Sequence, residues 1–121
     1  MESILNSIKQ LIGGIDENDS HFDTDLIIHI NSVFSTLNDI GVGPEETFSI
    51  VDDKPIWDDF VDADAYNDVK TYTYLKVKMI FDPPSSSSVM DAYKRTADEI
   101  EWRLSVRASN KTKEEDSDDE Q

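Results

Sequence analysis

Apolar residues recur at intervals of three and four along three stretches of the chain, and this spacing constrains the fold more than any other sequence feature. Residues three and four apart share one face of an α-helix. We therefore predict three amphipathic helices. Their apolar positions are Ile4, Leu5, Ile8, Leu11, Ile12 and Ile15; Leu26, Ile27, Ile30, Val33, Phe34 and Leu37; and Val89, Tyr93, Ala97, Ile100 and Leu104.

Residues that favour helix ends flank each stretch. Ser, Thr and Asp cap helix N-termini, and glycine adopts the left-handed conformation that ends a helix. The predicted ends are Ser3 and Gly13-Gly14 for the first helix, Asp23 or Thr24 and Gly41 for the second, and a capping box of Ser88 with Asp91 and an end near Arg107 for the last.

The stretch from Thr71 to Phe81 fits two structures. Its Tyr, Val and Ile residues favour strands, and lysines alternate with apolar residues at positions 75–79 as in a half-buried strand. A start at Asp64 and a stop at Asp82-Pro83-Pro84 fit a helix instead, and a run of this length is long for a strand. Periodicity alone leaves both open.

The 121 residues are enough for one small domain. Residues 41–56 contain two glycines and two prolines and are predicted to form an irregular loop with a short extended piece at residues 48–50, followed by a helical turn at residues 57–61. Residues 109–121 contain no apolar side chain and are predicted to be a disordered acidic tail. The expected organisation is a helical domain at residues 1–108 and this tail.

The chain carries 11 basic and 27 acidic side chains, a net charge of −16, and it has no cysteine. Residues 1–69 hold two basic and 16 acidic side chains, whereas residues 70–109 hold seven and five. Such a charge disfavours binding to the phosphate backbone of nucleic acids or to anionic lipids. It would suit a contact in which the acidic front of one subunit meets the basic flank of the next.

No motif predicts catalysis, a cofactor or a metal. Residues 16–27 superficially resemble a calcium-binding loop, but His21 stands where that loop needs glycine and Ile27 where it needs glutamate. The Gly41-Val42-Gly43 segment lacks the third glycine of a dinucleotide fingerprint and follows a helix. Because no motif predicts catalysis, we expect that the protein is not an enzyme. No leader peptide or membrane-spanning stretch is visible, so we expect a soluble protein.

Three segments of the chain resemble a known family. They are residues 4–44, which include Phe22-Asp23-Thr24-Asp25-Leu26; residues 69–84, which end in Phe81-Asp82-Pro83-Pro84; and residues 90–104, which end in Glu101-Trp102-Arg103-Leu104. The chain is similar here to the small head–tail connector proteins of long-tailed bacteriophages.

The resemblance implies an all-α fold of four to five helices, including a long helix through residues 71–81. It implies a non-enzymatic virion protein that forms a ring of about twelve copies. This ring docks under the portal protein after DNA packaging, binds a downstream connector or tail-completion protein, and lets DNA pass without specific binding. We expect it in the host cytoplasm during assembly and at the head–tail junction afterwards.

Aromatic residues gather in the second half of the chain, and Trp and Tyr favour interfaces. Trp102 lies off the apolar face of its helix, so we expect it to be exposed. The candidate subunit or portal contacts are Trp57, Phe81, Pro83, Pro84 and Trp102. The alternative function is an acidic DNA mimic or inhibitor that occupies the basic groove of a host nucleic-acid enzyme.

Overall fold

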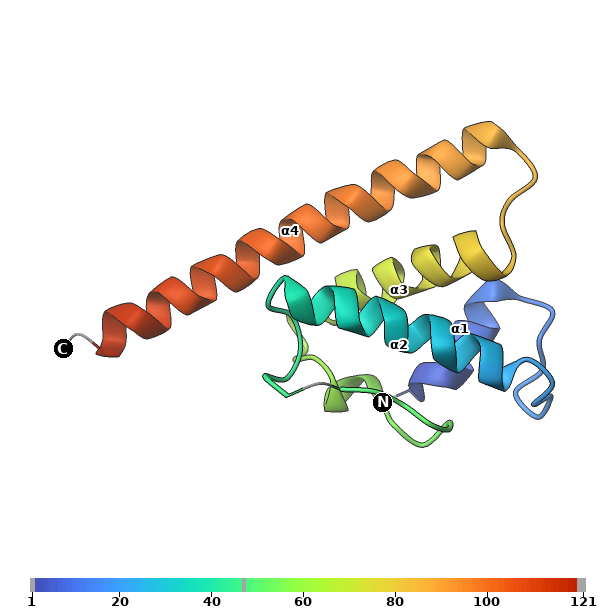
Figure 1. Cartoon of the computed structure of the whole chain (residues 1–121), viewed down its shortest axis with the longest axis horizontal. Helices are drawn as coiled ribbons and strands as arrows, with labels where there is room; N and C mark the ends of the chain where they lie inside the picture. Colours follow the sequence, from blue (N-terminus) through green and yellow to red (C-terminus); the bar gives the residue numbers. More distant parts are fainter. Residues whose placement is uncertain (1, 47, 120–121) are drawn as a thin grey trace.

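The computed structural model describes residues 2–46 and 48–119, and the side chains among them up to residue 111. Within these residues the chain forms four α-helices and one turn of 3₁₀-helix, and the predicted all-α fold is confirmed (Figure 1). The elements are α1 (Ile4–Ile12), α2 (Asp23–Asp39), η1 (Trp57–Asp59), α3 (Tyr66–Phe81) and α4 (Ser87–Asp119).

Helix α3 is the centre of the fold. It packs against α1, α2 and η1, and α4 lies along it (Figure 1). Its buried residues, Val69, Tyr72, Thr73, Leu75 and Val77, therefore lie around much of the helix. This explains why periodicity could not identify the stretch, because a helix covered on several sides has no single apolar face.

Helix α1 begins as predicted. The Ser3 hydroxyl accepts a hydrogen bond from the Asn6 backbone N–H at 3.2 Å, and Gly13 ends the helix with φ of +84°. Its apolar face is narrower than predicted, because Leu11 is 41% exposed at the end of the bundle.

The predicted cap of α2 is wrong. Asp23 lies within the first turn of the helix, and no side chain caps it. The Asp23 carboxylate instead contacts the ammonium of Lys9 at 2.5 Å. Its C-terminal end agrees with the prediction: Gly41 has φ of +93°, and the Val42 N–H donates to the Leu37 carbonyl at 2.9 Å.

Lys9 organises the loop between α1 and α2. Its side chain is 1% exposed, and its ammonium donates to the backbone carbonyls of Asp19, at 2.8 Å, and Glu17, at 3.4 Å, besides pairing with Asp23. The segment that superficially resembles a calcium loop thus surrounds an ammonium that belongs to the chain itself.

The loop at residues 41–56 is held by side chains. The Asn31 amide donates to the Ile50 carbonyl at 2.9 Å and accepts from the Ile50 N–H at 2.8 Å. These two bonds satisfy the backbone N–H and C=O of Ile50, as pairing with a neighbouring strand would. The predicted extended piece at residues 48–50 therefore forms no strand. The following helical turn is confirmed as η1, in which Trp57 is buried, and Phe60 and Val61 directly after it are buried as well.

Helix α4 begins earlier and ends later than predicted. The Ser86 hydroxyl, not that of Ser88, accepts from the Val89 N–H at 3.4 Å. The helix does not end near Arg107: its backbone continues to Asp119 and projects beyond the bundle (Figure 1). The division into a domain at residues 1–108 and a disordered acidic tail at residues 109–121 stays a prediction.

Candidate functional site

The structure separates the five candidate contact residues. Trp57 is fully buried, and its Nε1 donates to the Ser7 hydroxyl at 2.7 Å, so its side chain has no surface to offer a partner. Phe81 is half-buried against Phe22, with the two rings 5.4 Å apart. Pro83 is exposed and Pro84 is half-buried in the turn before α4, as part of the same end of the bundle.

Trp102 is 67% exposed, which confirms its expected exposure. Val106, one helical turn further on, is 38% exposed. Both lie on the side of α4 opposite the buried face that carries Ile100 and Leu104. We call Trp102 and Val106 the outer face of α4, and a large aromatic side chain exposed in this way is typical of a surface that contacts another protein.

A groove of about 670 Å³ lies beside the outer face, where α4 leaves the bundle. Its walls are α4 from residue 102 to residue 111, the loop at residues 41–43 and the segment at residues 60–65. Gly41 is needed here because a Cβ at this position would lie 3.1 Å from the Cβ of Ala108. The groove thus depends on the close approach of the loop to α4.

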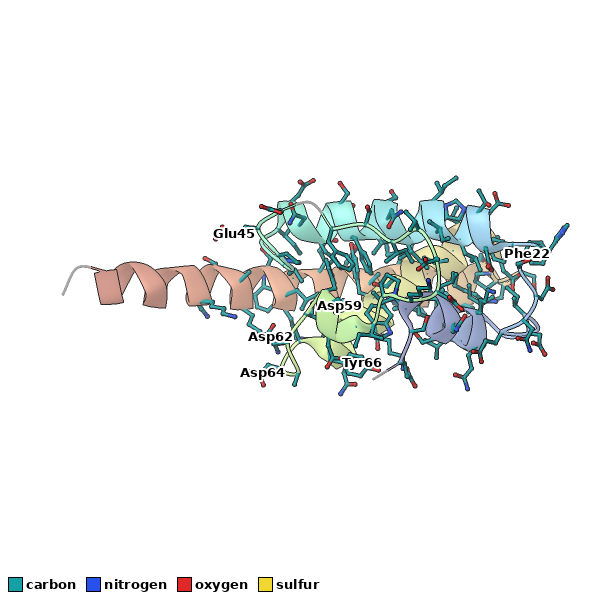
Figure 2. The ribbon with its side chains drawn as sticks, turned by 90° about the horizontal axis from the view of Figure 1, so that it is seen from below. Phe22, Glu45, Asp59, Asp62, Asp64 and Tyr66 are labelled. Carbon is teal, nitrogen blue, oxygen red and sulfur yellow. The ribbon has the colours of Figure 1, made fainter. Side chains whose placement is uncertain are left out.

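Ion pairs and a hydrogen bond to the backbone fasten α4 at this groove. Arg103 contacts the Asp68 carboxylate at 3.1 Å, Arg107 donates to the Asp64 carbonyl at 3.1 Å, and Lys111 contacts the Asp62 carboxylate at 3.3 Å. A hydrogen bond from its own backbone N–H and then Lys111 lower the pKa of Asp62. Figure 2 shows Asp62 and Asp64 near the point where α4 leaves the other helices.

A second apolar surface lies at the other end of α3. Leu11, Phe22 and Ile80 are 41%, 36% and 58% exposed, and we call these three residues the apolar end of the bundle. They come from the last turn of α1, the loop before α2 and the last turn of α3, which meet at one end of the molecule (Figure 1). Figure 2 shows Phe22 at the end opposite the projecting part of α4.

The three residues of the apolar end are not among the predicted contacts, although Phe81, which is, packs against Phe22 there. Leu11 fits the apolar spacing of its helix, which predicts a buried residue, and Ile80 lies in the stretch that fits two structures. The only signal was Phe22, an aromatic residue among acidic side chains in a loop that is otherwise polar.

Tyr72 lies between α3 and α4 and is fully buried. Burial, followed by the nearby Glu101 and Asp98 carboxylates of α4, raises the pKa of the Tyr72 hydroxyl to about 12. The hydroxyl makes no well-formed hydrogen bond. Its position serves the packing of α4 on α3.

Among the described residues, no three His, Cys, Asp or Glu side chains form a group that could hold a metal ion. No helix in the same part of the chain is long and apolar enough to cross a bilayer. The fold and its surfaces thus define a small all-helical protein with two exposed apolar surfaces.

The comparison with protein families identifies this class more closely. Residues 4–111 match the family described as phage connector protein, so the chain belongs to that family. The match supports a structural role in the phage particle and contact with other phage head or tail proteins. No curated protein and no solved structure matches the chain significantly.

Proposed function

We propose that the protein docks as a ring of about twelve copies under the portal after DNA packaging and offers the attachment surface for a downstream connector or tail-completion protein. The match of residues 4–111 to the phage connector family carries this proposal. The projecting part of α4 and the exposed Trp102 support it, because both are available to other proteins. The protein acts without catalysis and resides at the head–tail junction of the virion.

A phage that lacks the gene tests the role directly. We expect its heads to fill with DNA and to remain without tails, and the protein supplied from a plasmid to restore tailed particles. Electron microscopy of the lysate and the length of packaged DNA are the measurements. Tailed, infectious particles from the deletion phage would contradict the connector role, and empty heads would place the protein before packaging ends.

Partner binding is tested with purified components. We expect the protein to bind portal rings, and the resulting complex to bind the next tail-side protein. The DNA-mimic alternative is tested by measuring binding to a host nucleic-acid enzyme beside binding to the portal. Salt-sensitive binding to the enzyme, with no binding to the portal, would favour that function instead.

We further propose that the acidic surface keeps DNA from adhering to the channel. Twelve of the 16 acidic residues at positions 2–69 form no ion pair with a lysine or arginine in the described structure. Carboxylates on a channel wall would repel phosphates, and DNA would pass without specific binding. A reconstruction of the ring that places these carboxylates on its outside would contradict this role.

A further inference from the structure

We propose that two copies of this chain join head to tail, with the outer face of α4 on one copy packed against the apolar end of the bundle on the next. The inference rests on the proposed ring, because it names the subunit contact that such a ring requires. The two surfaces are those defined above: Trp102 and Val106 on one side, and Leu11, Phe22 and Ile80 on the other.

The two surfaces cannot meet within one chain. The contact between Arg103 and Asp68 places the outer face beside the first turn of α3, whereas Ile80 lies in the last turn of that helix. Twelve residues of α-helix separate those turns by about 18 Å. In addition, Trp102 points away from α3, because Leu104 on the opposite side of α4 is buried. Only a second molecule can bring the surfaces together.

The charges around the two surfaces are complementary. Residues 16–25, which surround Phe22, carry five acidic and no basic side chains. Residues 94–111, which surround Trp102, carry five basic and three acidic side chains. Arg103 is 42% exposed and Arg107 is 48% exposed despite their contacts with Asp68, so both can reach a carboxylate of another molecule. Opposite charges around apolar centres orient such a contact.

The contact joins two different surfaces and is therefore heterologous. After two copies have joined, one of them still has a free apolar end and the other a free outer face, so further copies can add at both ends. Repetition of a heterologous contact gives a closed ring when the rotation between copies permits it, and an open filament otherwise. Two copies that each use the same surface would stop at a dimer.

Two variants, each blocked at one surface, test the arrangement. Trp102→Asp blocks the outer face, and Ile80→Asp blocks the apolar end. Val51→Asp is the matched control, because Val51 is 81% exposed and lies outside both surfaces. We measure the mass of the full chain and of each variant by light scattering on a size-exclusion column at low salt, over a range of concentrations, with circular dichroism as a check of folding.

We expect wild type and Val51→Asp to form the same large oligomers, and each blocked variant alone to remain a monomer. Loss of an aromatic residue central to an interface weakens association by about thirtyfold or more. An equimolar mixture of the two blocked variants should form dimers and nothing larger, because the intact outer face of one meets the intact apolar end of the other. If Ile80→Asp proves unfolded, Phe22→Asp in the loop replaces it.

Three results would overturn the contact: a wild type that is monomeric at every concentration, blocked variants that still form large oligomers, or a mixture that forms no dimer. None of these results changes the phenotype that we expect of the deletion phage. A phage that yields full heads without tails would keep the connector role even if the subunits join through other surfaces.

Discussion

Replacement of Lys9 by methionine tests whether one buried ammonium holds the loop between α1 and α2. Methionine has a similar length and a similar helix propensity, so the substitution removes the charge and changes little else in α1. The substitution removes the ammonium that in wild type contacts the Asp23 carboxylate and the backbone carbonyls of Glu17 and Asp19.

The expected loss of unfolding free energy is about 3 kcal/mol. Removing one member of a buried ion pair costs about 3–5 kcal/mol, because the other member remains without its partner. The Asp23 side chain is 28% exposed, so water can solvate part of its charge, and the lower end of that range applies. For a domain of this size about 4 °C in Tm corresponds to each kcal/mol, which gives a decrease of about 12 °C.

The assay is urea unfolding followed by circular dichroism, with amide hydrogen exchange over residues 13–22 as a local measure. Lys54→Met is the matched control, since Lys54 is exposed and its side chain forms no ion pair in the described structure. A loss below about 1 kcal/mol for Lys9→Met, equal to that of the control, would refute the reasoning. Unchanged exchange in the loop would refute it independently.

Three further substitutions or truncations have defined outcomes. Tyr72→Phe should leave stability at pH 7 unchanged or raise it by up to about 1 kcal/mol, because it removes a buried hydroxyl without a hydrogen bond. It should also reduce the loss of stability above about pH 10 in wild type, where the unfolded chain releases a proton that folded Tyr72, with a pKa of about 12, retains. The raised pKa of Tyr74 leaves part of that loss in place, and urea unfolding against pH measures both effects. Gly43→Ala should cost about 2 kcal/mol more than Gly14→Ala, because both glycines have positive φ but only a Cβ at Gly43 would meet the Phe60 ring, at 2.5 Å; equal losses in thermal unfolding would contradict this. A chain that ends after Lys111 keeps the ion pairs between α4 and the bundle, so its Tm should fall by less than about 2 °C, and a larger fall would place the domain boundary later.

The helices that were predictable from sequence are those with one buried face. The helices α1 and α2 and the central part of α4 each cover a single side of the bundle, so their apolar residues recur at helical spacing. Capping was predictable at Ser3, because the hydroxyl accepts from the N–H of Asn6, three residues later in the sequence. The bond that the same hydroxyl donates to the Asp53 carbonyl, at 2.6 Å, was not predictable, because the two residues are fifty positions apart. The cap at Asp23 was not, because Lys9, fourteen residues earlier, competes for its carboxylate in the folded chain.

The candidate surfaces were likewise predictable only where they depend on residues close together in the sequence. The exposure of Trp102 followed from its position in the period of α4, and its role as a contact stays a prediction. Trp57 could not be assigned from sequence, since its burial depends on Ser7, which is fifty residues away and accepts the bond from its indole. The apolar end combines residues from three elements, and no pattern within one segment could bring Leu11 and Phe22 to Ile80.

The uneven charge of the sequence becomes more even in the fold. The last two helices carry most of the basic side chains, and they fold back on the acidic front half of the chain, so that Glu2 meets Lys70 and Asp62 meets Lys111. Acidic residues of the front half therefore act first as counter-ions that fasten α3 and α4. What remains for partners is the acidic surface that forms no ion pair, and four of its twelve carboxylates lie at residues 16–25 around Phe22. The charge that the sequence offers for a subunit contact is thus smaller than its total suggests, and this part of it lies beside apolar residues that can supply the affinity.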